Sequence, residues 1–460
     1  MQRHGLTRWQ KFWLSLPTMP GNLSGVLIHN AFLKYYTDII GMDPKLVGVI
    51  YAVFGVWNAI NDPAIGVLLD RAKYREGKGK YVYVMRRAAP VALFASLAMI
   101  FAQPGWQEWV TFAFLLALLF VYDTAMTAFG IAYSNYRLIA APSNEDRVDI
   151  SVYITYIANI GGFFGTLIPT LLLVGDADKS LTTLLFGGVL LLNAALYYVA
   201  LRPLKDAPEM YLQENAQISE RKGIFGDVFD NVREAARSKS FVAFMLAQIL
   251  AAGPRAFYFT PLLYMSDYVL KLKGIEATVI DVTMGLVLFA AVPFLGKLTK
   301  RLGLKGMMLA CTVPCALSYL ALSFVRGFPT AIAAYVAMYL FSSAVLIPQG
   351  PMLGAIIDED ELRTGRRKAG MFNGLNALLT VPVSGIQASL FMGIISAYGY
   401  RAGADVQSAR ALLGIRIGTG VLPFAFMLAS FVPLLLLPID RKRENELSAF
   451  AQSRQTDPRN

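Results

Sequence analysis

Apolar stretches long enough to cross a bilayer alternate with short polar loops along the whole chain. A helix needs about 20 apolar residues to cross the hydrocarbon core, and the pattern predicts twelve such spans. They cover residues 17–40, 45–70, 82–102, 110–136, 150–174, 181–201, 240–270, 276–298, 304–324, 331–357, 370–397 and 411–437. The pattern therefore predicts an all-α membrane protein with twelve transmembrane helices.

The longest polar interruption divides these spans into two sets of six. The predicted domains are an N-terminal six-helix bundle at 1–201, a cytoplasmic linker at 202–239, and a C-terminal six-helix bundle with a cytoplasmic tail at 240–460. Within the linker, an amphipathic run at 225–237 is expected to lie along the membrane interface. The sequence GVLLDR at 66–71 is echoed by GKLTKR at 296–301, which predicts two repeats with a site between them near the midplane.

Composition and charge support a membrane protein and exclude a nucleic-acid partner. The chain is 56% hydrophobic and 16% charged, whereas a soluble domain carries about 25% charged residues. The net charge is +11, but the basic residues crowd into loops on one predicted side, such as 71–80. This pattern predicts that both termini face the cytoplasm. The expected location of the protein is a membrane of the bacterial inner (plasma) type. The N-terminus shows no cleavable signal, and the spacing of Cys311 and Cys315 indicates packing rather than a disulfide or metal site.

The second span contains the strongest candidate for function, the segment from Asn58 to Pro63. Asp62 lies near mid-span, where an aspartate costs about 2.5–3.5 kcal/mol, so such residues are usually functional. Asn58 lies four residues earlier and shares its helical face, and Asn61 adjoins it. We expect Asp62, Asn58 and Asn61 to form a polar site inside the membrane.

Three other ionisable residues are predicted near mid-membrane. His29 lies in the first span and is interpreted either as a titratable group or as a hydrogen-bonded contact between helices. Asp123 in the fourth span and Arg255 in the seventh come from different halves. Because a charge is tolerated there only with a partner, we hypothesise that Asp123 and Arg255 pair across a central cavity.

Uncharged polar side chains occur on the spans expected to line that cavity. Amide and aromatic groups suit sugar rings, although many such residues only hold helices together. Tyr153, Tyr156 and Asn159 recur at i, i+3 and i+6 and are the preferred group. The candidates for the substrate cavity are Asn22, His29, Asp123, Tyr153, Tyr156, Asn159, Arg255, Gln349 and Asn373.

Glycines and prolines within the spans indicate where helices approach or bend. Gly161, Gly162 and Gly165 in the fifth span allow a neighbouring helix to come close. Pro254 in the seventh span and Pro348 in the tenth each free a backbone group beside a polar residue. We therefore expect bent helices at these two prolines.

Four segments together resemble the glycoside–pentoside–hexuronide:cation symporters of the major facilitator superfamily. They are YYTDIIG at 35–41, NDP at 61–63 with Gly66 and Asp70-Arg71, NEDR at 144–147, and DEDE at 358–361 followed by TGRR at 364–367. The resemblance implies the major facilitator fold, a cation site around Asp62, and a cytoplasmic gate that includes Asp70, Arg71, Arg147, Asp358 and Arg367. Asn58 and Asn22 stand where the family has acids, for the cation and the sugar respectively.

These observations predict a secondary transporter that moves a sugar, glycoside or sugar acid by alternating access, coupled to H⁺ or Na⁺. The expected protein is a monomer in the lipid bilayer with a small-molecule substrate, no cofactor, no metal site and no catalytic residues. One alternative keeps the fold but carries a lysophospholipid or another amphipathic solute, which suits the loss of the acid at Asn22. The other is a receptor or scaffold that does not transport.

Overall fold

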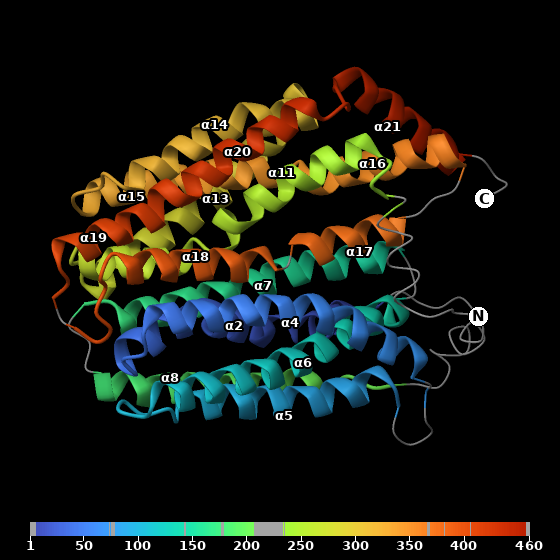
Figure 1. Cartoon of the computed structure of the whole chain (residues 1–460). Helices are drawn as coiled ribbons and strands as arrows, with labels where there is room; N and C mark the ends of the chain where they lie inside the picture. The colour runs from blue at the N-terminus through green and yellow to red at the C-terminus, as the bar shows by residue number, and fades with distance from the viewer. Residues whose placement is uncertain are drawn as a thin grey trace. The chain divides into compact units, whose positions relative to one another are not determined.

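The computed structural model describes residues 6–72, 74, 79–141, 144–175, 179–206, 233, 235–365, 369–380, 382–404 and 406–456 (Figure 1). The chain divides into two compact units. The first is Met1–Lys222 with Ala402–Asp405, and the second is Gly223–Arg401 with Val406–Asn460. Most of the predicted linker at 202–239, including most of its amphipathic run, lies outside the described residues.

The first unit begins with α1 (Arg8–Ser15). The first span follows as α2 (Thr18–Val26), η1 (Leu27–Ala31), α3 (Phe32–Lys34) and η2 (Tyr35–Ile39), where η denotes a π-helical turn. The other five spans are single helices: α4 (Pro44–Arg71), α5 (Tyr81–Met99), α6 (Glu108–Ala140), α7 (Asn144–Leu173) and α8 (Lys179–Leu201). Pro44 occupies the first helical position of α4, where its missing N–H is no loss.

The second unit contains more interrupted spans. The seventh is α11 (Lys239–Ala256), α12 (Phe259–Tyr264) and η5 (Met265–Val269); the eighth and ninth are α13 (Gly274–Leu302) and α14 (Leu304–Leu322). The tenth is α15 (Phe328–Leu346) and α16 (Gln349–Thr364), and the eleventh is α17 (Ala369–Thr380) and α18 (Val383–Ala397). The twelfth is α19 (Ala409–Arg416), η6 (Ile417–Val421) and α20 (Leu422–Leu436), and α21 (Arg441–Thr456) follows it.

Across the described residues the helices group into twelve segments that match the predicted spans. Ten of them are long and apolar enough to cross a membrane. The other two are the first span and α4, where polar residues such as Asn22, Lys34 and Asp62 interrupt the apolar sequence. The first span falls short in hydropathy because of these polar residues, whereas five side chains of α4 lie outside the described part of the chain.

Proline accounts for the breaks in the seventh and tenth spans. Pro254 lies in the last turn of α11, and the helix resumes at Phe259. Pro348 precedes α16 directly. Proline lacks an N–H and crowds the preceding turn, so it loosens a helix at that point. The predicted bends in these spans are therefore present.

Glycine allows α2 and α7 to pack closely, as the sequence predicts for Gly161 and Gly165. A Cβ at Gly161 would lie 2.2 Å from the Met19 carbonyl oxygen, and one at Gly165 would lie 2.9 Å from Val26 Cβ. Gly162, between them, faces open space, and a Cβ there would have no neighbour within 4 Å. Small residues let helix backbones approach in membranes, and here that contact brings the first and fifth spans together.

Candidate functional site

A polar cluster joins α4 to α6 inside the first unit. Asn61 Nδ2 donates to Asp123 Oδ2 at 3.0 Å, and Thr127 Oγ1 donates to Asp62 Oδ1 at 2.7 Å. With its amide nitrogen turned toward Asp62, Asn58 donates to the two carboxylate oxygens at 3.0 and 3.3 Å. Two carboxylates from two helices thus share a neighbourhood with two amides and a hydroxyl. We call these five residues the carboxylate cluster.

Helix geometry explains how the carboxylate cluster forms. Asn58 and Asp62 on α4, like Asp123 and Thr127 on α6, are four residues apart and lie on one face of their helices. The adjacent residues Asn61 and Asp62 each contact one member of the α6 pair. Asn61 and Asp123 are each 5% exposed, and Asp62 is half-buried. The cluster therefore places oxygen ligands suited to a hard cation, or two carboxylates able to hold a proton, away from bulk water.

The structure brings Asp62 together with Asn58 and Thr127, and Asp123 together with Asn61. Asp123 lies against Asn61, and its proposed partner Arg255 belongs to the other unit, so the pair stays a prediction. Sequence reasoning missed Thr127 and the contact between α4 and α6. The four-residue spacing of Asp123 and Thr127 could have indicated that Thr127 shares the face of Asp123. A threonine in an apolar span is common, however, so the spacing alone did not single it out.

His29 lies beside the carboxylate cluster's helices, among aromatic rings. Its ring centroid is 5.4 Å from that of Phe54 on α4 and 6.2 Å from that of Tyr122 on α6. It belongs to η1, where the π turn displaces the helix register. The observed contacts are therefore ring packing between the first, second and fourth spans, and the titration of His29 stays a prediction.

Polar residues on α2 and α7 are exposed rather than packed between helices. Tyr156 is 59% exposed, Asn22 and Asn159 are also exposed, and Tyr153 is half-buried. Asn22 Nδ2 donates to the Thr18 carbonyl oxygen at 3.0 Å, one turn earlier in its own helix. Exposed amides at membrane depth are tolerated where they border water, so this face suits the wall of an aqueous cavity.

In the second unit, Arg255 and Gln349 join the breaks of the seventh and tenth spans. Arg255 Nη1 donates to Gln349 Oε1 at 2.9 Å. Gln349 is 5% exposed, and its Nε2 is buried without a hydrogen-bond partner among the described residues. A buried donor left unsatisfied costs about 1–3 kcal/mol, so this amide is suited to bind a polar solute or water. Asn373 is part of α17, but its side chain lies outside the described part of the structure.

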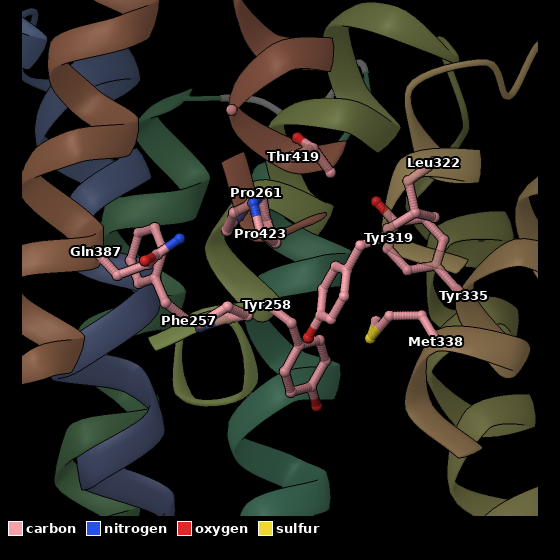
Figure 2. A pocket seen from close by; sticks show the side chains of 12 residues that line it. Phe257, Tyr258, Pro261, Tyr319, Leu322, Tyr335, Met338, Gln387, Thr419 and Pro423 are labelled. Carbon is pink, nitrogen blue, oxygen red and sulfur yellow. The ribbon is translucent and has the colours of Figure 1, made fainter. Parts of the chain in front are cut away.

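A small cavity of about 10 Å³, enough for about one water molecule, lies beside the break in the seventh span (Figure 2). Tyrosines from α14, α15 and the α11–α12 break surround it together with Gln387. The hydroxyls of Tyr319, Tyr335 and Thr419 are buried and have no hydrogen-bond partner in the part of the chain that the structure describes. The sequence did not single out these three residues, because whether a hydroxyl is unpaired depends on packing from five different spans.

The predicted gate residues are only partly described. Arg367 and the side chains of Asp70, Arg71 and Arg147 lie outside the described part of the chain, and Asp358 is half-buried on α16. The gate therefore stays a prediction.

A different ionic contact occurs at the start of α7, within the NEDR segment and just after it. Lys11 Nζ of α1 pairs with Asp146 at 2.9 Å and with Asp149 at 2.6 Å. The hydrogen bonds to Asp149 and Asp146 raise the pKa of Lys11 well above its usual range. Asp146 also accepts a hydrogen bond from the Leu6 N–H at 3.1 Å. These contacts attach α1 to the predicted cytoplasmic end of the fifth span.

The tail helix α21 is attached in a similar way within the second unit. Arg443 Nε lies 3.6 Å from Glu359 Oε1 of α16, and Glu444 Oε2 accepts the Leu304 N–H at 2.9 Å. Two acids of the DEDE segment thus make contacts within their own unit, Glu359 with Arg443 and Asp360 with Arg363 at 2.6 Å.

The fold and the polar groups inside it define a secondary transporter of the major facilitator type. The crystal structure of the nucleoside transporter NupG aligns with a TM-score of 0.64 and 14% identity, covering 94% of this chain and 100% of that chain. At this identity the likeness shows the fold alone, and it confirms the predicted one. The chain belongs to the family described as MFS/sugar transport protein, whose profile matches residues 14–441.

Three relatives extend over most of the chain. The uncharacterized symporter YnaJ of Bacillus subtilis (strain 168) is 22% identical and covers 94% of this chain and 92% of its own length. The isoprimeverose transporter of Lactiplantibacillus pentosus is 23% identical and covers 96% of this chain and 91% of its own length. The sodium-dependent lysophosphatidylcholine symporter 1-A of Danio rerio is 22% identical and covers 96% of this chain and 88% of its own length. The predicted resemblance to glycoside–pentoside–hexuronide:cation symporters is confirmed.

Proposed function

We propose that this transporter couples the movement of H⁺ or Na⁺ to that of a polar organic solute, with the cation bound at the carboxylate cluster. The observation that carries this proposal is that each carboxylate accepts a hydrogen bond from the helix of the other: Asp123 from Asn61, the neighbour of Asp62, and Asp62 from Thr127. The family's usual second acid on the second span is Asn58 here, and Asp123 supplies a carboxylate from α6 instead. In this proposal the site still has two acids, Asp62 and Asp123, but they come from two helices instead of one.

The chemistry of the cluster suits a cation that binds and leaves. A sodium ion would use the carboxylate oxygens of Asp62 and Asp123, with the Thr127 hydroxyl and amide oxygens completing its coordination. A proton would be held between two carboxylates that cannot both stay charged at close range. Movement of α4 relative to α6 would change either form of binding, which links the cation to the access state.

The solute is proposed to be a sugar, glycoside or sugar acid. Support comes from the amide of Gln349 with its unpaired Nε2, the adjacent guanidinium of Arg255, and the exposed face of Tyr156 and Asn159. Such groups bind hydroxyl and carboxylate oxygens, and aromatic faces stack on sugar rings. The name of the isoprimeverose transporter agrees with this class of solute.

An amphipathic solute is the second candidate, favoured by an apolar groove of about 540 Å³ on α4, α5 and α6. The stacked rings of Trp57 and Phe120, 4.5 Å apart, form one wall of it. Trp57 immediately precedes Asn58, so the groove approaches the carboxylate cluster from the apolar side. The name of the Danio rerio relative, a sodium-dependent lysophosphatidylcholine symporter, agrees with a lipid-like solute.

The remaining features of the proposal concern the protein's setting. It places the chain in a plasma membrane as a monomer, with both termini in the cytoplasm, as the basic loops favour. The cycle needs no cofactor beyond the coupling cation and no catalytic residue. A receptor or scaffold without transport would leave the charges inside the membrane without a role.

Counterflow in proteoliposomes tests the function directly. Purified protein would be reconstituted with a panel of sugars, sugar acids and lysolipids, each at several pH values and sodium concentrations. The proposal expects exchange of at least one sugar or sugar acid and stimulation of net uptake by a proton or sodium gradient. Exchange of lysolipids only would favour the second candidate, and binding without flux for every solute would refute transport.

A further inference from the structure

A second groove of the first unit lies between α5 and α8, which run side by side (Figure 1). Its volume is about 440 Å³. None of its residues belongs to the carboxylate cluster or to the proposed solute cavity. The groove is lined by Arg86, Ala89, Pro90, Leu93, Ala194, Tyr197, Tyr198, Leu201 and Arg202.

The groove has one basic end and an otherwise apolar wall. Arg86 Nη2 donates to the carbonyl oxygens of Leu201, Arg202 and Leu204 at 3.2, 3.3 and 2.9 Å. All three bonds use the same nitrogen, and the side chain as a whole stays exposed. Arg86 is thus fixed at the end of α8, beside the exposed Arg202, and the rest of its guanidinium can bind an anion.

Asp206, a described acid at this end, is already engaged by backbone donors. Asp206 Oδ2 accepts the backbone N–H groups of Lys80 and Val82, at 2.9 and 3.0 Å, at the start of α5. Two guanidiniums therefore border the groove mouth with one carboxylate that caps a helix. This charge balance favours a negatively charged occupant.

The depth of the groove matches one leaflet of a bilayer. Arg86 and Leu93 are seven residues apart, so the lined part of α5 extends about 10 Å along the helix, within the ~15 Å of hydrocarbon in one leaflet. The surrounding surface is apolar: Phe94 is 72% exposed, Leu191 60% and Tyr198 69%. An acyl chain thus finds a continuous apolar surface below the arginines.

We propose that this groove binds an anionic phospholipid of the leaflet at the basic end of the unit. Its phosphate lies between Arg86 and Arg202, and one acyl chain follows Ala89, Leu93 and Ala194. Guanidinium groups bind phosphate oxygens through paired N–H donors. Basic pockets between transmembrane helices on the cytoplasmic side bind lipid head groups in the same way. The bound lipid joins the third span to the sixth and is not the transported solute.

Native mass spectrometry of the purified full-length chain tests the proposal. The protein would be equilibrated with mixed micelles that contain equal amounts of phosphatidylglycerol and phosphatidylcholine of the same acyl length. We expect retained adducts of phosphatidylglycerol to exceed those of phosphatidylcholine by about fivefold for each arginine that contacts the phosphate. Equal retention of the two lipids on the wild-type chain would overturn the proposal.

Two variants test the two ends of the groove separately. Arg202→Gln removes one charge but keeps the backbone carbonyl that Arg86 contacts, and it should lower the preference for phosphatidylglycerol about fivefold. Ala194→Trp fills the apolar part and should remove adducts of both lipids. Arg401→Gln, an exposed arginine in the loop after the eleventh span, is the matched control for charge and should bind like the wild type.

Inorganic phosphate separates a lipid site from a simple anion site. Millimolar phosphate should leave the phosphatidylglycerol adduct in place, because the acyl chain contributes to binding. Displacement by phosphate, or retention of the lipid by Ala194→Trp, would show that the apolar groove is not the site. This measurement needs no transport activity, so its result is independent of the proposed function.

Discussion

Asp123→Asn separates cation coupling from the binding of solute. The substitution removes one of the two carboxylates of the cluster but keeps its shape. The replacement amide retains an oxygen that can accept the hydrogen bond from Asn61 Nδ2, now 3.0 Å from Asp123 Oδ2. Folding should therefore be preserved, while the negative charge offered to the cation is lost.

The size of the effect follows from the kind of contact that is lost. A hydrogen bond or ligand contact to a charged group contributes about 1.5–3 kcal/mol. Since 1.4 kcal/mol corresponds to a factor of ten, the cation should bind about 10- to 150-fold more weakly. Because Asn61 and Asp123 are each only 5% exposed, water compensates little for the missing charge.

The assay compares two modes of transport by the same proteoliposomes. Exchange of labelled solute at equal concentrations on both sides needs no net movement of cations, and it should stay within about threefold of the wild type. Accumulation of solute driven by a sodium or proton gradient should fall by at least tenfold. The gradient that drives accumulation in the wild type identifies the coupling ion.

Two variants calibrate the result. Thr127→Val removes a neutral hydroxyl that donates to Asp62 at 2.7 Å, and it should weaken cation activation only about three- to tenfold. Asp149→Asn removes an acid outside the cluster and should leave coupling unchanged. If Asp123→Asn accumulates solute as well as the wild type, the assignment of the cation to the carboxylate cluster is wrong.

Three further predictions concern other parts of the molecule. Gly161→Ala should destabilise the purified protein by about 1–3 kcal/mol, because its Cβ would lie 2.2 Å from a backbone oxygen of α2. Gly162→Ala is the control, since a Cβ there has free space. Equal melting temperatures of the two variants would contradict this packing. Arg255→Gln should weaken solute binding at least tenfold, measured by titration of purified protein, and unchanged affinity would remove Arg255 from the site. Lys11→Gln should lower the melting temperature at pH 7. Because the pKa of Lys11 is raised, its ion pairs should persist below the ordinary lysine pKa and weaken only as pH rises through the raised value. A difference in melting temperature between the wild type and Lys11→Gln that shrinks between pH 6 and 9 would contradict that contact.

The repeated span of about twenty apolar residues was enough to predict the twelve helices. Each helix satisfies its own backbone hydrogen bonds, which in a bilayer leaves length and hydropathy as the main requirements. The same local logic predicted the bends near Pro254 and Pro348 and the close packing at Gly161. A stricter hydropathy criterion misses only the first span among those it could test, where polar residues such as Asn22 and Lys34 lower the average.

The partners of polar residues were less predictable than the residues themselves. Asp62 and Asn58 could be grouped because they are four residues apart on one helix. Asp123 was recognised as a charge inside the membrane, but its contact with Asn61 depends on how α6 packs against α4, 62 residues away in sequence. The unpaired hydroxyls of Tyr319 and Tyr335 were likewise invisible, since their neighbours come from other spans.

The amino-acid sequence by itself determined the helices, their order and the membrane as their solvent, because these depend on local composition and on the cost of unpaired backbone groups in lipid. Only the tertiary structure decided which carboxylate lies in the cluster with Asp62, where the Arg86 side chain of α5 contacts the end of α8, and which donors remain unpaired. Such pairings are set by contacts between distant segments, where a shift of a few ångströms makes or breaks a hydrogen bond.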